Sequence, residues 1–175
     1  LRILCVQEDV ADHVIHMLKG AMSELTIGDP SLLSTDIGPV IDEEAKQIIL
    51  NHIAKLSGEG CPVFQAVPQS DLDRQGGSFV APTLIELRQL SQLKREVFGP
   101  VLHVVRYARK NLTSLLRQIN ELGYGLTMGL HTRIDETINQ VIDLAKVGNL
   151  YVNRNIVGAV VGVQPFGGEG LSGTG

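Results

Sequence analysis

The chain has 175 residues, of which 43% are hydrophobic and 19% charged, and its formal net charge is −4. The apolar share excludes a disordered chain, and the length suits one domain of ordinary size. The acidic balance argues against a general binder of nucleic-acid backbones, and no apolar stretch approaches the ~20 residues of a membrane span.

Apolar periodicity divides the chain into alternating strands and helices. In chain order these are a strand at 1–6, helices within 9–25 and 42–58, strands at 62–67, 79–87 and 101–107, a helix within 112–122, a strand at 126–131, a helix within 134–145 and a strand at 149–153. Strands that alternate with helices indicate crossover connections. We therefore expect an α/β fold with a mostly parallel sheet flanked by helices, and one domain over residues 1–175.

Local signals refine these elements. Asp42 is a plausible N-cap for its helix, and Thr132 and Asp135 have the spacing of a capping box. Pro82 suggests an edge position or an irregularity in its strand, and a polar turn is expected between 67 and 79. The core-facing stripe of the first helix is expected to comprise Val10, Val14, Met17, Leu18, Ala21 and Leu25.

Several candidate sites have simpler interpretations. Residues 168–173 match G-x-G-x-x-G, but a proline and a phenylalanine precede the match instead of a strand and no helix can follow, so a flexible glycine-rich segment near a site is favoured over a phosphate loop. Cys5 lies among apolar residues and Cys61 has no histidine near it in sequence, so both are read as packing residues. The histidines lack zinc-ligand spacing, and no metal is expected. Two cysteines also exclude a disulfide scaffold and favour a cytoplasmic location.

Two segments have unusual compositions. Glu96-Val97-Phe98-Gly99-Pro100 is a rigid turn that presents a carboxylate and an aromatic ring immediately before a strand. Residues 158–168 combine small residues, whose backbone N–H groups are accessible, with one large aromatic, Phe166. Such a loop can bind a small carboxylate through its amides, although the same composition suits close packing.

Together these segments resemble motifs of the aldehyde dehydrogenase superfamily. Residues 96–100 look like its E-x-F-G-P motif, and residues 165–173 look like its P-F-G-G-x-x-x-S-G ending, with Gly170 where many members have lysine. The amino-acid sequences of residues 35–42, 149–155 and 158–168 are more similar to one branch of the superfamily. That branch is the Δ1-pyrroline-5-carboxylate (L-glutamate γ-semialdehyde) dehydrogenase module of bacterial bifunctional proline utilization proteins.

The resemblance implies a reaction and roles for residues. A cysteine thiolate attacks the aldehyde, hydride passes to NAD, and water hydrolyses the resulting thioester. By similarity, Glu96 would bind the nicotinamide ribose and Phe98 would support the nicotinamide end. The backbone amides of Gly158 and Ala159 would anchor the substrate carboxylate, and Phe166 would pack on the aliphatic part of the substrate.

The resemblance also implies what lies outside these residues. The nucleophilic cysteine is expected just before Leu1, the base glutamate and the coenzyme-binding domain further upstream, and the isolated chain is expected to be inactive. FAD is expected only in a proline dehydrogenase domain outside this chain. We expect the parent protein to be a homo-oligomer, with peripheral membrane association as a possibility. No contact of this chain with nucleic acid is expected. Two alternatives stay open: an aldehyde dehydrogenase of another substrate branch, and a non-catalytic binding or assembly module with the same fold.

Overall fold

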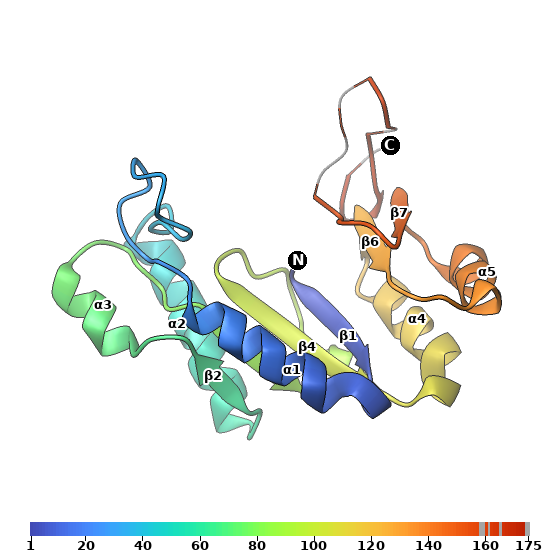
Figure 1. Cartoon of the computed structure of the whole chain (residues 1–175), viewed down its shortest axis with the longest axis horizontal. Coiled ribbons are helices and arrows are strands. Elements are labelled where there is room, and N and C mark those ends of the chain that lie inside the picture. Colours follow the sequence, from blue (N-terminus) through green and yellow to red (C-terminus); the bar gives the residue numbers. More distant parts are fainter. Residues whose placement is uncertain (158–159, 161, 165, 174–175) are drawn as a thin grey trace. The chain divides into compact units, whose positions relative to one another are not determined.

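The structure is a computed structural model that describes residues 1–157, 160, 162–164 and 166–173. Its internal contacts divide the chain into two compact units, Leu1–Ala108 and Arg109–Gly175, which we describe separately. Each unit contains strands and helices, which are labelled in Figure 1.

A four-stranded sheet forms the centre of the first unit, in the order β1-β4-β3-β2. The strands are β1 (Ile3–Gln7), β2 (Val63–Gln65), β3 (Thr83–Leu87) and β4 (Val101–Tyr107). β4 is parallel to both β1 and β3, and it lies beside β1 in Figure 1. Only β2 is antiparallel to its neighbour. The expectation of a mostly parallel sheet is confirmed.

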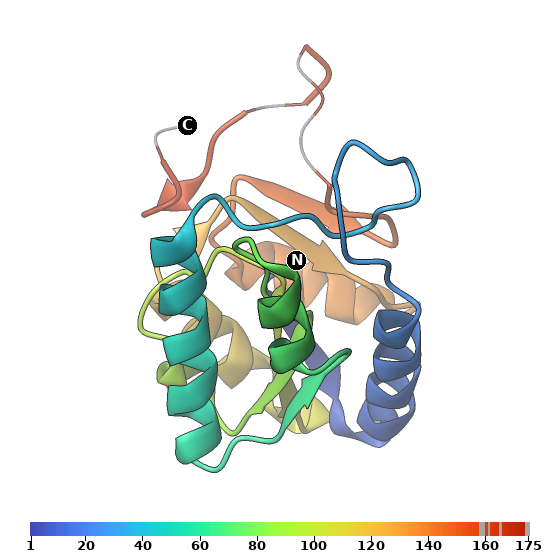
Figure 2. The ribbon, with the colours of Figure 1, turned by 90° about the vertical axis from the view of Figure 1, so that its left-hand side faces the viewer.

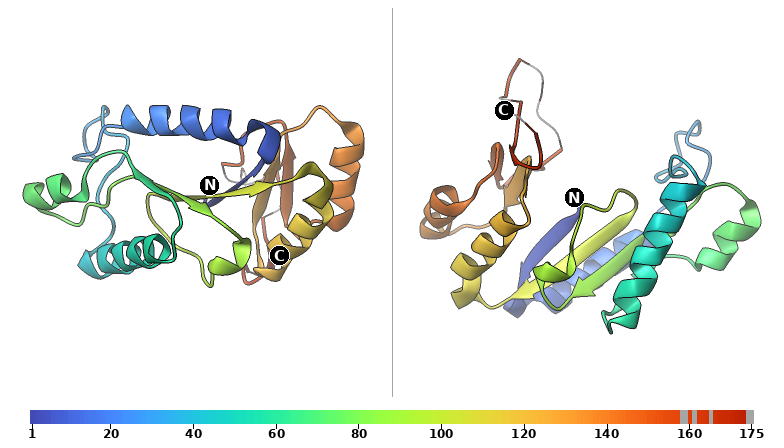
Figure 3. Two further views of the ribbon diagram at one scale, coloured as in Figure 1. Left: turned by 90° about the horizontal axis from the view of Figure 1, so that it is seen from below. Right: turned by 180° about the vertical axis from the view of Figure 1, so that it is seen from behind.

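Helices cover both faces of this sheet. α1 (Glu8–Ser23) lies on one face and α2 (Glu43–Gly58) on the other, as Figures 2 and 3 show. Alternation along β4 sends Val104 toward α1, where it joins a buried cluster with Ala11 and Ile15, and sends His103 toward α2. The remaining elements of this unit are α3 (Gln69–Gln75) and the short 3₁₀ helix η1 (Leu90–Gln92).

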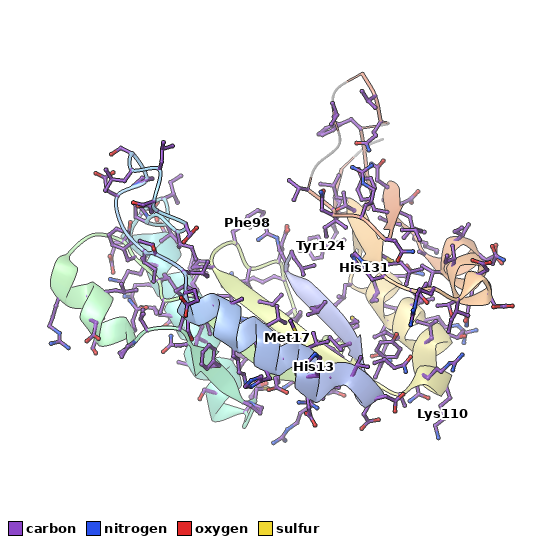
Figure 4. All side chains as sticks on the ribbon, in the orientation of Figure 1. His13, Met17, Phe98, Lys110, Tyr124 and His131 are labelled. Atoms are coloured by element: carbon purple, nitrogen blue, oxygen red, sulfur yellow. The ribbon has the colours of Figure 1, made fainter. Side chains whose placement is uncertain are left out.

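Several local expectations can be checked in this unit. Asp42 caps α2, since its carboxylate accepts a hydrogen bond from the Ala45 N–H at 2.7 Å. The apolar stripe expected for α1 is only partly right: Val14 and Leu18 pack against the buried cluster, whereas Val10 and Met17 are exposed. Ala11 and Ile15, which the stripe left out, are buried. Figure 4 shows Met17 on the outward side of that helix.

The region around Pro82 also differs from expectation. The strand that follows Pro82, β3, is paired on both sides and is not an edge strand. Pro82 lies just before it, where its carbonyl accepts a hydrogen bond from the Ala66 N–H at 3.0 Å and no N–H is required. The expected polar turn contains α3, which is stabilised by a salt bridge of 2.8 Å between Lys46 of α2 and Asp73.

The described residues of the second unit form two small sheets, two α-helices and one short 3₁₀ helix. Its elements are η2 (Arg109–Asn111), α4 (Leu112–Glu121), β5 (Tyr124–Gly125), β6 (Thr127–Leu130), α5 (Asp135–Leu144), β7 (Asn149–Val152) and β8 (Glu169–Gly170). β6 and β7 are parallel, and β5 pairs with β8 in the antiparallel sense. The capping box at Thr132 is wrong: Ile134 is the N-cap of α5 without a side-chain cap, and Thr132 accepts a hydrogen bond from the Ile134 N–H instead.

The expected α/β class is confirmed in both units. The assignment of residues 1–175 to one catalytic domain stays a prediction. Among the described residues, no helix has the length and apolar character needed to cross a membrane.

Candidate cofactor and substrate site

Residues 96–100, which we call the cofactor loop, lead directly into the central strand β4. The Pro100 carbonyl accepts a hydrogen bond from the Thr83 N–H at 2.9 Å, so the loop ends on the neighbouring strand. Gly99 has a φ of +147°, and a Cβ there would lie 2.5 Å from Cδ1 of the buried Ile49. Only glycine combines this backbone conformation with such a close approach to α2.

One arginine contacts three consecutive residues of the cofactor loop. Nε of Arg2 lies 2.6 Å from Oε1 of Glu96, and Nη1 donates to the Val97 carbonyl at 2.9 Å. The guanidinium carbon lies 3.7 Å from the centroid of the Phe98 ring, a cation–π contact. A planar guanidinium can make all three contacts at once, because its donors form a fixed fork and its face stacks on aromatic rings.

The loop presents an acceptor and an apolar surface next to each other. The Glu96 side chain is 33% exposed and Phe98 is 67% exposed. Figure 4 shows Phe98 projecting away from the ribbon before β4. A carboxylate accepts hydrogen bonds from sugar hydroxyls, and a ring beside it covers an apolar heterocycle. The roles expected of Glu96 at the nicotinamide ribose and of Phe98 at the nicotinamide end stay predictions.

The substrate-binding residues expected from the sequence belong to the second unit. Phe166 is 81% exposed, whereas Gly158 and Ala159 lie outside the described residues. A neighbouring turn is organised by Gln164, whose Oε1 accepts hydrogen bonds from the Val160 N–H at 2.9 Å and from the Tyr151 hydroxyl at 3.4 Å. The roles of the substrate-binding residues stay predictions.

The glycine-rich ending is a packing seam. Tyr124 and Gly125 pair with Gly170 and Glu169, and the Gly125 N–H donates to the Ser172 hydroxyl at 2.9 Å. A Cβ on Gly148 would overlap the Gly167 carbonyl, so the two backbones touch. We call these contacts, between residues 167–173 and the glycines 123, 125 and 148, the glycine seam.

Neither cysteine has the properties of a nucleophile. Burial in the β1 strand raises the pKa of the Cys5 thiol to about 12, so the reactive thiolate is strongly disfavoured. Cys61 is 4% exposed, and its sulfur lies 3.3 Å from the Gln92 amide nitrogen. Within the part of the chain that is described, no cluster of histidine, cysteine and carboxylate side chains could hold a metal.

Sequence reasoning missed two arginines. Arg2 lies 95 positions from Val97 in the sequence, so no local pattern links it to the cofactor loop. Arg154 lies with its guanidinium 4.8 Å from the centroid of the Tyr151 ring, at the end of β7 and before the expected carboxylate anchor. The only sequence signal for either was a basic residue next to a strand end.

Comparisons with known proteins identify the family of the chain. The model of the aldehyde dehydrogenase family matches residues 1–175. The chain therefore belongs to the aldehyde dehydrogenase family.

Individual relatives show which members of the family the chain is similar to. The chain is 64% identical over its full length to the bifunctional protein PutA of Escherichia coli (strain K12), of which it covers 14%. It is 34% identical over 97% of its length to a 1-pyrroline-5-carboxylate dehydrogenase of Bacillus cereus, of which it covers 32%. A crystal structure of a Bradyrhizobium japonicum proline utilization A (PutA) mutant is 56% identical over the whole chain, with a TM-score of 0.90 and 17% of that protein covered. The chain thus spans about one seventh of the length of the PutA proteins it matches.

Proposed function

We propose that this chain is part of an NAD-dependent dehydrogenase that oxidises L-glutamate γ-semialdehyde, formed from Δ1-pyrroline-5-carboxylate, to L-glutamate. The aldehyde carbon gives a hydride to NAD, and a water molecule supplies the second carboxylate oxygen, with release of protons. The parent protein would act in proline catabolism and would be a longer, oligomeric protein that contains a coenzyme-binding domain.

The observation that carries the proposal is the cofactor loop. Its exposed aromatic ring and its carboxylate are held next to each other by Arg2 and by the close contact at Gly99. In the proposed enzyme, Glu96 accepts hydrogen bonds from the ribose hydroxyls and Phe98 supports the nicotinamide end. NAD, when bound there, supplies the hydride acceptor.

The proposal that the substrate is L-glutamate γ-semialdehyde is supported by the relatives of the chain. The names of two groups of relatives, bifunctional PutA and 1-pyrroline-5-carboxylate dehydrogenase, both point to the same aldehyde. In this proposal the amides of Gly158 and Ala159 bind the α-carboxylate of the substrate, and Phe166 packs against its methylene groups. Arg154, which lies between the end of β7 and these residues in the sequence, adds a positive charge to the second unit.

The thiol nucleophile of the proposed reaction is neither Cys5 nor Cys61. The pKa of Cys5 is raised to about 12 by burial, and Cys61 is buried beside α2. Replacing each of them by serine should therefore change the turnover number of the parent enzyme less than twofold, whereas loss of a true thiol nucleophile abolishes turnover.

The substrate is tested by comparing aldehydes in the parent enzyme. NADH formation should be much faster with L-glutamate γ-semialdehyde than with succinate semialdehyde or an aliphatic aldehyde, judged by kcat/KM. Succinate semialdehyde is the informative competitor, because an aldehyde dehydrogenase structure 25% identical to this chain was solved with succinate as its reaction product. Equal or better use of succinate semialdehyde would reject the glutamate branch. A parent protein that leaves NAD unreduced with every aldehyde would favour a non-catalytic module.

A further inference from the structure

Two histidines form a hydrogen-bonded pair between α2 and the sheet of the first unit. Nε2 of His52 and Nε2 of His103 are 2.8 Å apart, and the two rings meet edge to face at 77°. His103 is only 2% exposed. Its other ring nitrogen, Nδ1, lies 3.1 Å from the carbonyl oxygen of Arg2, which also accepts the His103 backbone N–H at 3.0 Å.

These distances determine which nitrogens carry protons. A carbonyl oxygen can only accept, so Nδ1 of His103 is the donor to Arg2. The neutral His103 ring then has a lone pair on Nε2, and His52 must donate its Nε2–H to it. A proton on Nε2 of His103 as well would point two N–H groups at each other across 2.8 Å. The arrangement therefore requires a neutral His103 that carries its proton on Nδ1, and a His52 that donates from Nε2.

We propose that His103, supported by His52, is a positioning residue for the NAD site, because it fixes the Arg2 backbone from which the guanidinium holds Glu96, Val97 and Phe98. This inference rests on the proposed function, in which that loop receives the nicotinamide ribose. Neither histidine touches the cofactor in this scheme. Both act through Arg2.

The surroundings of the pair keep it neutral. His52 borders a surface hollow of about 350 Å³ that is also lined by Lys55, Lys94 and Arg95. Burial, Lys55 and Arg95 lower the pKa of His52, and Glu59 opposes this shift. Burial lowers the pKa of His103 to about 4, with the neighbouring His52 acting in the same direction and the bond to Arg2 against it. At neutral pH the required tautomers are therefore the stable ones.

Fixing the Arg2 backbone matters because the guanidinium contacts depend on short distances. The ion pair to Glu96 and the bond to Val97 are 2.6 Å and 2.9 Å long. A displacement of about 1 Å at a positioning group can change reactivity ~100-fold. The Arg2 carbonyl has two donors from one residue, His103, so loss of the imidazole donor leaves Arg2 held there by the backbone bond alone.

The test uses the parent enzyme with two replacements at one position. His103→Phe removes both ring nitrogens at similar volume, whereas His103→Asn keeps an amide N–H close to the place of Nδ1. The measurements are the NAD dissociation constant by equilibrium titration without aldehyde, and KM for NAD and for the aldehyde. His16→Phe, at an exposed position of α1, is the matched control.

We expect the variants to change the binding of NAD much more than the KM for the aldehyde. His103→Phe should raise the NAD dissociation constant about tenfold, the equivalent of one lost hydrogen bond, and the aldehyde KM less than ~2-fold. His103→Asn should stay within ~3-fold of the original protein for NAD, since it keeps the donor to Arg2. The control should change neither constant.

A second pair of variants covers the case in which His103→Phe does not fold. His52→Gln keeps an N–H near Nε2 and should bind NAD normally, while His52→Phe should bind it more weakly. The inference is overturned if Phe and Asn at position 103, or Phe and Gln at position 52, behave alike, or if NAD and aldehyde constants rise together. Failure of the original enzyme to oxidise the semialdehyde while it still binds NAD would overturn the proposed substrate and leave this inference standing.

Discussion

The cofactor loop and the glycine seam hold expected site residues by opposite means. Long side chains hold the loop: Arg2 contacts three of its residues, and Ile49 lies against Gly99. At Gly148 and Gly170 the seam has no room for a Cβ, since the carbonyls of Gly167 and Gly123 already lie there. A side-chain clamp can be weakened by degrees through conservative substitution, whereas a backbone contact is lost when any Cβ is added.

The largest expected effect tests the seam. Gly148→Ala puts a methyl group onto the Gly167 carbonyl, so one backbone must move and the β5–β8 pairing with it. We expect the free energy of unfolding of the second unit to fall by more than ~3 kcal/mol, the upper range for overpacking. Urea denaturation combined with hydrogen exchange of β6 and β7 amides measures this. Gly58→Ala, with open space around the added methyl, is the control, and equal losses in both variants would contradict a backbone contact.

The pH dependence of stability tests the unit that carries the cofactor loop, because the buried His103 lies in it. The pKa of His103 is about 4 in the folded chain, below its ordinary value of 6.5. The unfolded chain therefore binds the proton first. The stabilisation is complete above pH 6.5 and is lost as the pH falls toward 4, by about 3 kcal/mol.

The measurement is the free energy of unfolding at several pH values for the original protein and for His103→Asn. Subtracting the two curves removes the common titration of surface carboxylates. Between pH 6.5 and 4 the original protein should lose more stability than the variant. Parallel curves would mean that His103 is protonated at its ordinary pKa, in conflict with its burial and with the proton that its Nε2 accepts from His52.

Gly99→Ala should have a smaller effect, because the obstacle at the cofactor loop is the end of a side chain. The added methyl meets Cδ1 of Ile49, and the residue keeps a φ of +147°. We expect a loss of about 2 kcal/mol, from backbone strain and the clash together. The double variant with Ile49→Val removes Cδ1 and should recover part of this loss. A double-mutant cycle with no coupling between positions 49 and 99 would contradict the contact.

Sequence reasoning succeeded where the determinants are local. Asp42 predicts the start of α2, and the β-branched run before Tyr107 predicts β4. The cofactor loop was identified for the same reason: its five consecutive residues form a motif. In each case the residues that decide the structure are neighbours in the chain.

It failed where distant residues decide the structure. α3 reads as a polar turn, but Lys46 binds Asp73, and Gln69 bonds to the backbones of Phe79 and Ala81. Arg2 belongs to the candidate site only because β1 and β4 are neighbours in the sheet. Val10 and Met17 were wrongly assigned to the buried side of α1, because they are as apolar as the residues that do face the core.

The smallest expected effect tests whether replacing a glycine lowers stability because of the glycine itself or because of the atoms that surround it in the seam. Gly20 lies inside α1, and a Cβ there would have nothing within 4 Å. Gly20→Ala should therefore stabilise the first unit by about 0.5–1 kcal/mol, because alanine loses less backbone entropy in a helix. Thermal or urea unfolding measures the gain. A loss of stability at Gly20 comparable to that at Gly148 would mean that replacing glycine is harmful anywhere in this chain, and the distinction between clamp and seam would no longer hold.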